Sequence, residues 1–239
     1  MSSTISNQPL WVTPNTGWGR WRAALWRRLL TWRHQLFPPS PDRLTLEYID
    51  VTPFIVLPTV FNPVLFRTGR FLAQTITNLP LKPNQVVLDL GTGSGVGAIF
   101  AAQQGTYAIA SDINPDAVRC ARLNADLNHL SDRVICTTGD LFSAVTVQKF
   151  DWVFFNPPFY QGKPQHVLDY AWRGEAVFER FTAQLRPQLT ATGHAVLILS
   201  SDGDGQHLIN LLQNSNYTLE IINRQNLINE ILTAYLITP

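Results

Sequence analysis

The chain has 239 residues, of which 45% are hydrophobic, so it can form a substantial core and is not an intrinsically disordered protein. Its formal net charge is +1, but residues 1–41 hold five arginines and no acid, which leaves residues 42–239 with the balance of −4. The two cysteines, Cys120 and Cys136, are too few for a disulfide framework and have no metal-ligand spacing with histidine. We therefore expect reduced thiols, no metal and a cytoplasmic location.

The N-terminal region predicts an appendage. Residues 1–17 are rich in Ser, Thr, Asn and Pro without periodicity, which is typical of a flexible tail. Residues 18–36 predict a basic amphipathic helix, and their arginines keep the segment from being an apolar membrane span. This helix could pack on the rest of the chain, contact RNA or a membrane surface, or target the protein to an organelle. Its apolar positions are Trp18, Trp21, Leu25, Leu29, Trp32 and Leu36.

We place the main domain at residues 42–239. Its first segment, from Leu44 to Pro58, is rich in β-branched residues but contains two prolines, which predicts an edge strand or an extended segment. Asn62 followed by Pro63 predicts the start of a helix that ends before the prolines of residues 80–83.

Strand and helix patterns then alternate along the chain. Such alternation predicts a doubly wound, mostly parallel α/β sheet, whose ligands lie at the carboxyl ends of the strands. Two last runs, Tyr217–Ile222 and Ile231–Ile237, are too close in sequence for a crossover helix and predict an antiparallel hairpin. The predicted strands are 85–90, 107–112, 133–137, 150–155 and 194–200, and the predicted helices are 95–104, 114–128, 174–190 and 204–214.

A glycine loop follows the first strand of this alternation. Gly91, Gly93 and Gly95 come between a strand and a helix, where glycine lets the backbone turn tightly and a ligand approach its amides. The same residues partly fit a dinucleotide fingerprint, and an ordinary tight turn is a further alternative.

Two acidic residues end the next two strands. Asp112 lies 19 residues after Gly93, where a carboxylate can accept hydrogen bonds from both hydroxyls of a ribose. It could instead cap a helix, although Asn114 before Pro115 suits that role better. Asp140 is placed to accept from an adenine amino group while Leu141 covers the ring, or it is a solvated turn aspartate.

Asn156-Pro157-Pro158-Phe159 follows an apolar strand and is the most specific signal in the chain. The Asn156 side-chain oxygen and the Pro157 carbonyl can accept both hydrogens of a planar amide or aromatic amine, while Phe159 stacks on its plane. Fixed carbonyl acceptors also stabilise the positive charge that develops on a nitrogen as it is methylated. The alternative is a proline-capped strand end.

With both signals in place, residues 60–239 resemble the class I S-adenosyl-methionine-dependent methyltransferases that carry an N-P-P-[FY] motif. The resemblance implies a Rossmann-like, seven-stranded sheet with an antiparallel last strand. It implies the cofactor S-adenosyl-methionine over the glycine loop, Asp112 on its ribose and Asp140 near its adenine. Asp89 would orient the loop and approach the methionine amino group.

Two families within this group compete. The HemK-like glutamine methyltransferases resemble the chain in Asp112-Ile113-Asn114-Pro115, in Ala171-Trp172-Arg173-Gly174 and in the placement of Arg224-Gln225. Ribosomal RNA guanine-N2 methyltransferases resemble it in Asn-Pro-Pro-Phe followed by Tyr160-Gln161-Gly162. We favour an N-methyltransferase whose acceptor is a protein glutamine over one that methylates the exocyclic amine of an RNA base. A cofactor-binding scaffold subunit without its own activity is a third interpretation.

Overall fold

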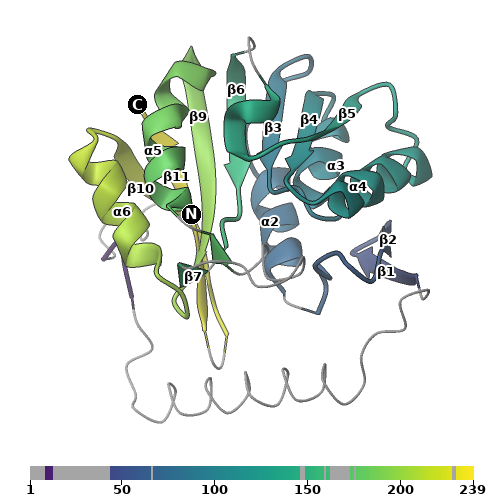
Figure 1. Ribbon diagram of the computed structural model, residues 1–239, viewed down its shortest axis with the longest axis horizontal. Helices are drawn as coiled ribbons and strands as arrows, with labels where there is room; N and C mark the ends of the chain where they lie inside the picture. The colour runs from purple at the N-terminus through teal and green to yellow at the C-terminus, as the bar shows by residue number, and fades with distance from the viewer. Residues whose placement is uncertain are drawn as a thin grey trace.

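The computed structural model describes residues 9–12, 44–65, 67–145, 149–158, 160–161, 173–174, 176–227 and 230–239. Its centre is one seven-stranded sheet with helices on both faces (Figure 1). The strands are β1 (Thr45–Ile49), β2 (Thr52–Val56), β3 (Val86–Leu90), β4 (Tyr107–Asp112), β5 (Val134–Thr138), β6 (Phe150–Phe155), β7 (Tyr160–Gln161), β8 (Arg173–Gly174), β9 (Leu189–Ser200), β10 (Thr218–Asn226) and β11 (Ile231–Thr238). The helices are α2 (Thr68–Thr77), α3 (Val96–Ala102), α4 (Pro115–Leu127), the short 3-10 helix η1 (Leu141–Ala144), α5 (Val177–Gln188) and α6 (Gly205–Asn214).

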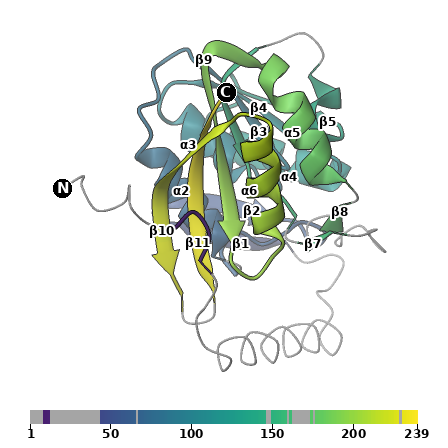
Figure 2. The same cartoon turned by 90° about the vertical axis from the view of Figure 1, so that its left-hand side faces the viewer.

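The strand order of the large sheet is β10-β11-β9-β6-β3-β4-β5. Strands β3, β4, β5, β6 and β9 pair in parallel, whereas β11 runs antiparallel to both β9 and β10. Figure 2 shows the β10–β11 hairpin closing this side of the sheet, with α6 beside it. The predicted doubly wound sheet with an antiparallel last strand is therefore confirmed.

The core has two layers because both faces of the parallel strands are apolar. On one face, α2, α3 and α4 contribute Phe71, Ile99 and Ala121 to a cluster that includes Val87 and Phe154 of the sheet. The opposite face is covered by α5 and α6. Their buried side chains pack on Leu88, Val153 and Leu197 of the sheet and are Phe178, Phe181, Leu185, Leu208, Ile209 and Leu212.

Register brings the two sequence signals to one edge of the sheet. In the β3–β6 pair, Leu90 lies opposite Phe155, and in the β3–β4 pair it lies opposite Ser111. The next residue after each strand therefore leaves the sheet at the same level. The glycine loop and Asn156 emerge from neighbouring strands, as expected for a parallel sheet.

The segment from Leu44 to Pro58 differs from the single extended strand that its sequence predicts. It folds into the two-stranded antiparallel sheet β1–β2, because Asp50 adopts a left-handed conformation (φ 53°) that reverses the chain. Pro53 is tolerated in β2 because this strand ends the small sheet.

Two other boundaries also shift. The helix predicted from Asn62 begins at Thr68, because the Asn62 Oδ1 atom accepts from the amides of Val64 and Leu65 (2.9 and 3.0 Å) and forms a turn there. Strand β9 begins at Leu189 instead of residue 194, directly after α5, whose last turn contains Pro187.

Residues 9–12, which fall in the predicted flexible tail, lie against the C-terminal strands and α6. The Arg224 Nη2 atom donates to the Pro9 carbonyl oxygen (3.0 Å), and the Tyr235 hydroxyl donates to the carbonyl oxygen of Leu10. The predicted helix at 18–36 lies outside the described residues. Within the described part of the chain, no helix is both long and apolar enough to cross a membrane.

The β1–β2 hairpin is attached to the domain through a buried amide on α4. Asn124 is fully buried, its Oδ1 atom accepts from the Ile55 amide (2.6 Å), and its Nδ2 atom donates to the carbonyl oxygens of Ile55 (2.8 Å) and Ser94 (2.9 Å). The Asn124 side chain thus makes the hydrogen bonds to Ile55 that a neighbouring strand would otherwise make. It also joins β2 to Ser94 in the glycine loop.

We predict that Asn124→Leu destabilises the protein by about 3 kcal/mol, because buried backbone groups of Ile55 and Ser94 lose their partner. Urea unfolding followed by circular dichroism would measure this loss. Asn210→Leu, which removes an exposed amide from α6, is the control and should change the free energy of unfolding by less than about 0.5 kcal/mol. Equal effects for the two variants would contradict the role of Asn124.

Candidate active site

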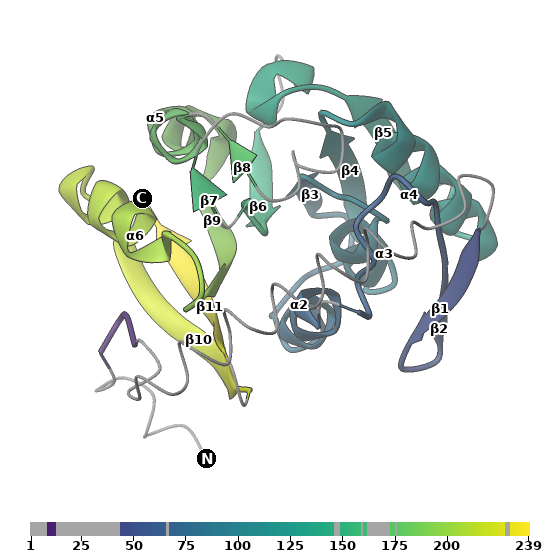
Figure 3. The same ribbon diagram turned by 60° about the horizontal axis from the view of Figure 1, so that its bottom comes forward.

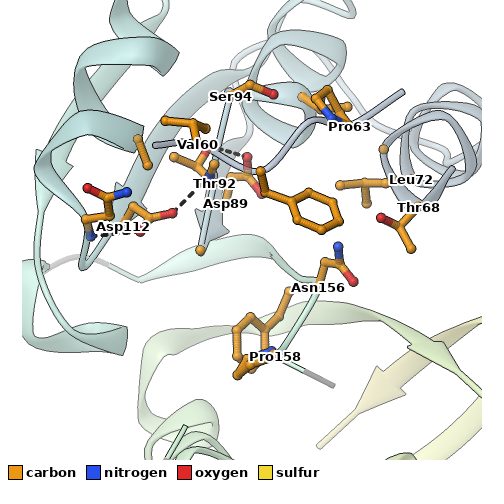
Figure 4. A pocket seen from close by; sticks show the side chains of 18 of the residues that line it. Val60, Pro63, Thr68, Leu72, Asp89, Thr92, Ser94, Asp112, Asn156 and Pro158 are labelled. Atoms are coloured by element: carbon orange, nitrogen blue, oxygen red, sulfur yellow. Dashed lines mark hydrogen bonds between the residues drawn. The ribbon is translucent and has the colours of Figure 1, made fainter. Parts of the chain in front are cut away.

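An open cleft lies at the carboxyl ends of β3, β4 and β6. Its empty volume, which includes the solvent at its mouth, is about 950 Å³. Figure 4 shows Asp112 at one end of the cleft, with Thr68 and Asn156 toward the other. The lining residues are Thr59, Val60, Phe61, Pro63, Thr68, Gly69, Leu72, Asp89, Gly91, Thr92, Gly93, Ser94, Val96, Asp112, Asn114, Ala117, Phe155, Asn156, Pro157 and Pro158.

The glycine loop turns through left-handed backbone conformations. Gly91, Gly93 and Gly95 have backbone φ values of 63°, 55° and 91°, which residues with a Cβ atom rarely adopt. A Cβ atom on Gly93 would have no neighbour within 4 Å, so glycine is needed there for conformation and leaves the loop open to a ligand. The loop ends at Gly95, directly before the first residue of α3.

Asp89 organises the loop from below. It is 3% exposed, and one carboxylate oxygen accepts from the Thr92 hydroxyl (2.6 Å) and the Ala98 amide (2.9 Å). Burial raises the pKa of Asp89 to about 6, although the hydrogen bonds from Thr92 and Ala98 act in the opposite direction. This carboxylate therefore fixes both the start of the loop and the first turn of α3.

Gly97 provides the space for this carboxylate. A Cβ atom built on Gly97 would lie 2.4 Å from the Asp89 Oδ1 atom, closer than nonbonded atoms can approach. Gly97→Ala would normally stabilise a helix by about 1 kcal/mol. Here we predict that it destabilises the protein by about 2 kcal/mol, because Asp89 must move away from its partners. A urea unfolding curve for this variant that shows wild-type or higher stability would contradict the packing.

Asp112 receives two backbone hydrogen bonds. Its Oδ2 atom accepts from the Gly93 amide and its Oδ1 atom accepts from the Asn114 amide, both at 2.9 Å. Burial is the largest cause of its raised pKa. The helix-capping role falls to Asn114, whose Oδ1 atom accepts from the Asp116 amide (3.0 Å). Asp112 lines the cleft at the loop, and its contact with a ribose stays a prediction.

Asp140 and Leu141 lie next to the third strand, as expected, but neither is among the residues that line the cleft. The Asp140 carboxylate pairs with the Arg180 guanidinium at 2.8 Å, and both side chains are about two-fifths exposed. Arg180 comes from α5, and no sequence signal pointed to this partner. The roles of Asp140 and Leu141 at an adenine ring stay predictions.

Asn156, Pro157 and Pro158 line the cleft directly after β6. The Asn156 Oδ1 atom is buried and has no hydrogen-bond partner among the described residues. Two further buried oxygens without a partner, Thr68 Oγ1 and Ser94 Oγ, belong to residues that line the same cleft. A buried polar atom without a partner is costly, so these atoms are suited to groups that a ligand supplies. Phe159 lies outside the described residues.

One wall of the cleft was not predicted from the sequence. It is the connection from Thr59 to Leu72, which includes Phe61 and the start of α2. The Thr59 hydroxyl donates to the Asp116 carboxylate (2.7 Å), and the Asn114 Nδ2 atom donates to the Thr59 carbonyl oxygen (3.1 Å). These bonds fasten the wall to the first turn of α4. Asn62-Pro63 predicted the start of a helix, whereas the structure has a turn there, and only tertiary contacts place this connection beside the glycine loop.

Cysteine and metal chemistry have no support in the described part of the chain. Burial raises the pKa of both Cys120 and Cys136 to about 11, so their thiols stay protonated near neutral pH. Among the described residues, no cluster of three or more His, Cys, Asp or Glu side chains is arranged to hold a metal ion.

Comparison with known proteins agrees with this fold and cleft. Residues 53–227 match the family model of the methyltransferase small domain. The chain is 35% identical over 170 residues to a Methanocaldococcus jannaschii protein provisionally named a protein N5-glutamine methyltransferase, a match that covers 67% of this chain and 84% of that protein. A release factor glutamine methyltransferase of Shewanella oneidensis is 38% identical over 117 residues, 48% of this chain and 40% of that enzyme.

RNA-modifying proteins are also similar to the chain. A tRNA1(Val) (adenine(37)-N6)-methyltransferase of Porphyromonas gingivalis is 32% identical over 129 residues, 49% of this chain and 51% of that enzyme. The crystal structure of the M. jannaschii tRNA m1G37 methyltransferase superposes with a TM-score of 0.60 at 21% identity, over 82% of this chain and 57% of that one. The chain thus spans about half or less of several relatives, and the structural likeness shows the fold alone.

The seven-stranded sheet, with a glycine loop at the carboxyl ends of its strands, is a Rossmann-like fold of the kind found in methyltransferases. The chain belongs to the methyltransferase small domain family.

Proposed function

We propose that the protein transfers a methyl group from S-adenosyl-methionine to the side-chain nitrogen of a glutamine in another protein. The observation that carries this proposal is the Asn156 Oδ1 atom, which is buried at the cleft without a partner. An unpaired buried acceptor favours a ligand that brings an N–H donor. A primary amide nitrogen is such a donor.

The residues at the loop end of the cleft fit the cofactor. The open space at Gly93 leaves room for a nucleoside, and Asp112 keeps lone pairs for ribose hydroxyls. The buried Asp89 carboxylate is suited to an ammonium group. When bound, S-adenosyl-methionine supplies an electrophilic methyl group on a positively charged sulfur.

The residues at the other end fit an amide acceptor. Asn156 Oδ1 and the Pro157 carbonyl oxygen would accept the two amide hydrogens and direct the nitrogen toward the cofactor. These oxygens stabilise the positive charge that develops on the nitrogen, and a proton then leaves the methylated nitrogen to water. The nitrogen gains a bond to carbon, the carbon–sulfur bond breaks, and no residue of the chain has to act as a strong base.

Charge favours a protein over RNA as the acceptor. The charged residues that line the cleft are Asp89 and Asp112, and no Lys or Arg is among the described lining residues. Residues 42–239 as a whole carry a charge of −4. RNA binding depends on cations that neutralise phosphates, whereas a glutamine amide needs only uncharged acceptors. Two relatives with glutamine methyltransferase names support the same choice.

The RNA alternative is the exocyclic amine of a base, because its two hydrogens could occupy the same acceptors. The similarity to the tRNA adenine-N6 enzyme supports this second candidate. A scaffold subunit that binds the cofactor without catalysis is a third. Mutation of Asn156 distinguishes catalyst from scaffold, and the chemical nature of the labelled product distinguishes protein from RNA.

The proposed contact of Asp89 with the cofactor ammonium predicts a pH-dependent affinity. Burial raises the Asp89 pKa from 3.8 to about 6, so the free protein holds a proton below that pH. A neighbouring ammonium requires the ionised carboxylate, and binding must therefore displace this proton. We expect the dissociation constant for S-adenosyl-methionine to rise about tenfold from pH 7 to pH 5. Isothermal titration calorimetry would measure it, and an Asp89→Asn variant should lack the step.

The raised pKa of Asp89 also determines how the free energy of unfolding of the ligand-free protein changes with pH. Because the folded-state pKa exceeds the unfolded value, the Asp89 contribution to stability is fully present below pH 3.8 and is lost as the pH rises through about 6. A dissociation constant that does not vary between pH 7 and pH 5 would contradict the proposed contact.

Asn156→Ala tests the catalytic role. We expect the rate of methyl transfer to fall by about 100-fold or more, because one of the acceptors that align the nitrogen is lost. Affinity for S-adenosyl-methionine should stay within about twofold, since Asn156 follows β6 and the glycine loop proposed to hold the cofactor follows β3. Asn78→Ala, which removes an exposed amide at the end of α2, is the control. Radiolabelled methyl transfer into an extract of cells that lack the gene measures the rate.

Ribonuclease and protease digestion then identify the acceptor. Label that depends on Asn156 and is released only by protease supports the glutamine proposal. Release only by ribonuclease would move the function to RNA. Equal labelling by wild type and Asn156→Ala would contradict a catalytic Asn156 and favour the scaffold interpretation.

A further inference from the structure

The outer face of the β1–β2 hairpin is apolar and exposed. Leu46 lies opposite Ile55 and Tyr48 opposite Pro53 on this face, with Leu44 in line with them. Leu44, Leu46 and Tyr48 are each more than half exposed, and Val51 at the turn is 90% exposed. Single exposed apolar residues are common, but a row at alternate positions of one strand marks an interaction surface.

This face is exposed although the hairpin itself is firmly held. Its inner face carries Ile49 and Phe54, both fully buried, and the Phe54 ring stacks on Phe100 with 6.3 Å between centroids. The edge of β2 that does not pair with β1 is held by α4. The Ile55 amide donates to Asn124, and the Asn128 Nδ2 atom donates to the Pro53 carbonyl oxygen (3.0 Å). The outer apolar row therefore belongs to a fixed strand and is not a frayed end.

The edge of β1 is also available. Within the described part of the chain, β1 pairs only with β2, so its second edge has unpaired backbone groups. Edge strands are commonly protected by lysine, proline or an inward-pointing charge. β1 has neither lysine nor proline. Its one charged side chain, Glu47, lies opposite Phe54 on the inner face and accepts a hydrogen bond from Asn62, so the outer face of β1 carries no charge.

The hairpin continues directly into the wall of the cleft. Thr59, the first lining residue, is only three residues beyond the end of β2. The Glu47 Oε1 atom accepts from the Asn62 Nδ2 atom (2.9 Å), which joins β1 itself to the turn between Phe61 and Pro63. Figures 1 and 3 show the hairpin beside α4 at the border of the molecule. A macromolecule that inserts one residue into the cleft can therefore reach β1.

We propose that β1 docks the protein acceptor as an added strand, with Leu44, Leu46 and Tyr48 contacting apolar side chains of an extended acceptor segment. This inference rests on the proposed glutamine acceptor. Strand addition supplies backbone hydrogen bonds, and the alternate side chains supply selectivity. Residues 44–58 contain two acidic residues and no Lys or Arg, so this surface suits an apolar or basic peptide and not a phosphate backbone.

The test compares intact and short acceptors. The probes are a purified bacterial release factor and a short peptide that carries its acceptor glutamine, each methylated by the full-length chain. The double variant Leu46→Ser/Tyr48→Ser should raise KM for the intact release factor about tenfold and leave kcat within about twofold. KM for the peptide and the dissociation constant of S-adenosyl-methionine should not change.

Ile135→Ser is the matched control. Ile135 is 67% exposed on β5, an edge strand at the other side of α4, and its loss should change none of these values. An unchanged KM for the release factor in the double variant would overturn docking on β1 but leave the proposed function intact. A wild-type dimer that the double variant converts to a monomer, with unchanged KM, would assign the face to a second copy. Labelling of RNA by the wild type, dependent on Asn156, would overturn the protein acceptor and the docking proposal together.

Discussion

The site depends on the register between β3 and β6. Two other strands, β4 and β5, come between them in sequence, yet parallel pairing sets Leu90 opposite Phe155. The residues that directly follow Leu90 and Phe155 therefore leave the sheet at the same edge, the carboxyl ends of the parallel strands, where ligands bind in such folds. The glycine loop and the Asn-Pro-Pro turn therefore become two sides of one cleft. A shift of one strand by a single residue would turn its side chains to the opposite face.

Buried polar side chains with hydrogen-bond partners hold the backbone around the cleft. Asp89 stays beneath the loop because Thr92 and Ala98 donate to it and Gly97 leaves it room. Asn124 likewise fixes backbone at the glycine loop, because its side-chain amide joins Ile55 of β2 to Ser94. In both places a buried group with its hydrogen bonds made fixes the backbone, whereas the Asn156 Oδ1 atom has no partner among the described residues. The contrast between paired and unpaired groups separates scaffold from site.

Much of the fold could be predicted from the sequence because its strands are short apolar runs between clear turn signals. Strands β4 and β6 have the predicted bounds, and β3 and β5 lie within one residue of them. The β1–β2 hairpin could not be predicted, since its turn uses Asp50 in a left-handed conformation and its β2 strand contains Pro53. The early end of α5 and the long β9 depend on pairing between Leu189 and Phe150, which is a tertiary contact.

The candidate site was predictable where a local motif carries it. Gly91, Gly93, Asp112 and Asn156 all line the cleft, while the wall from Thr59 to Leu72 has no motif of its own and is placed by contacts with α4. The proposed function depends on what the cleft methylates. Mass spectrometry of a cell extract incubated with the protein and S-adenosyl-methionine tests this most directly. We predict a methyl group added to the side-chain nitrogen of a protein glutamine, absent with Asn156→Ala. A methylated RNA base, or a methyl group that does not depend on Asn156, would contradict it.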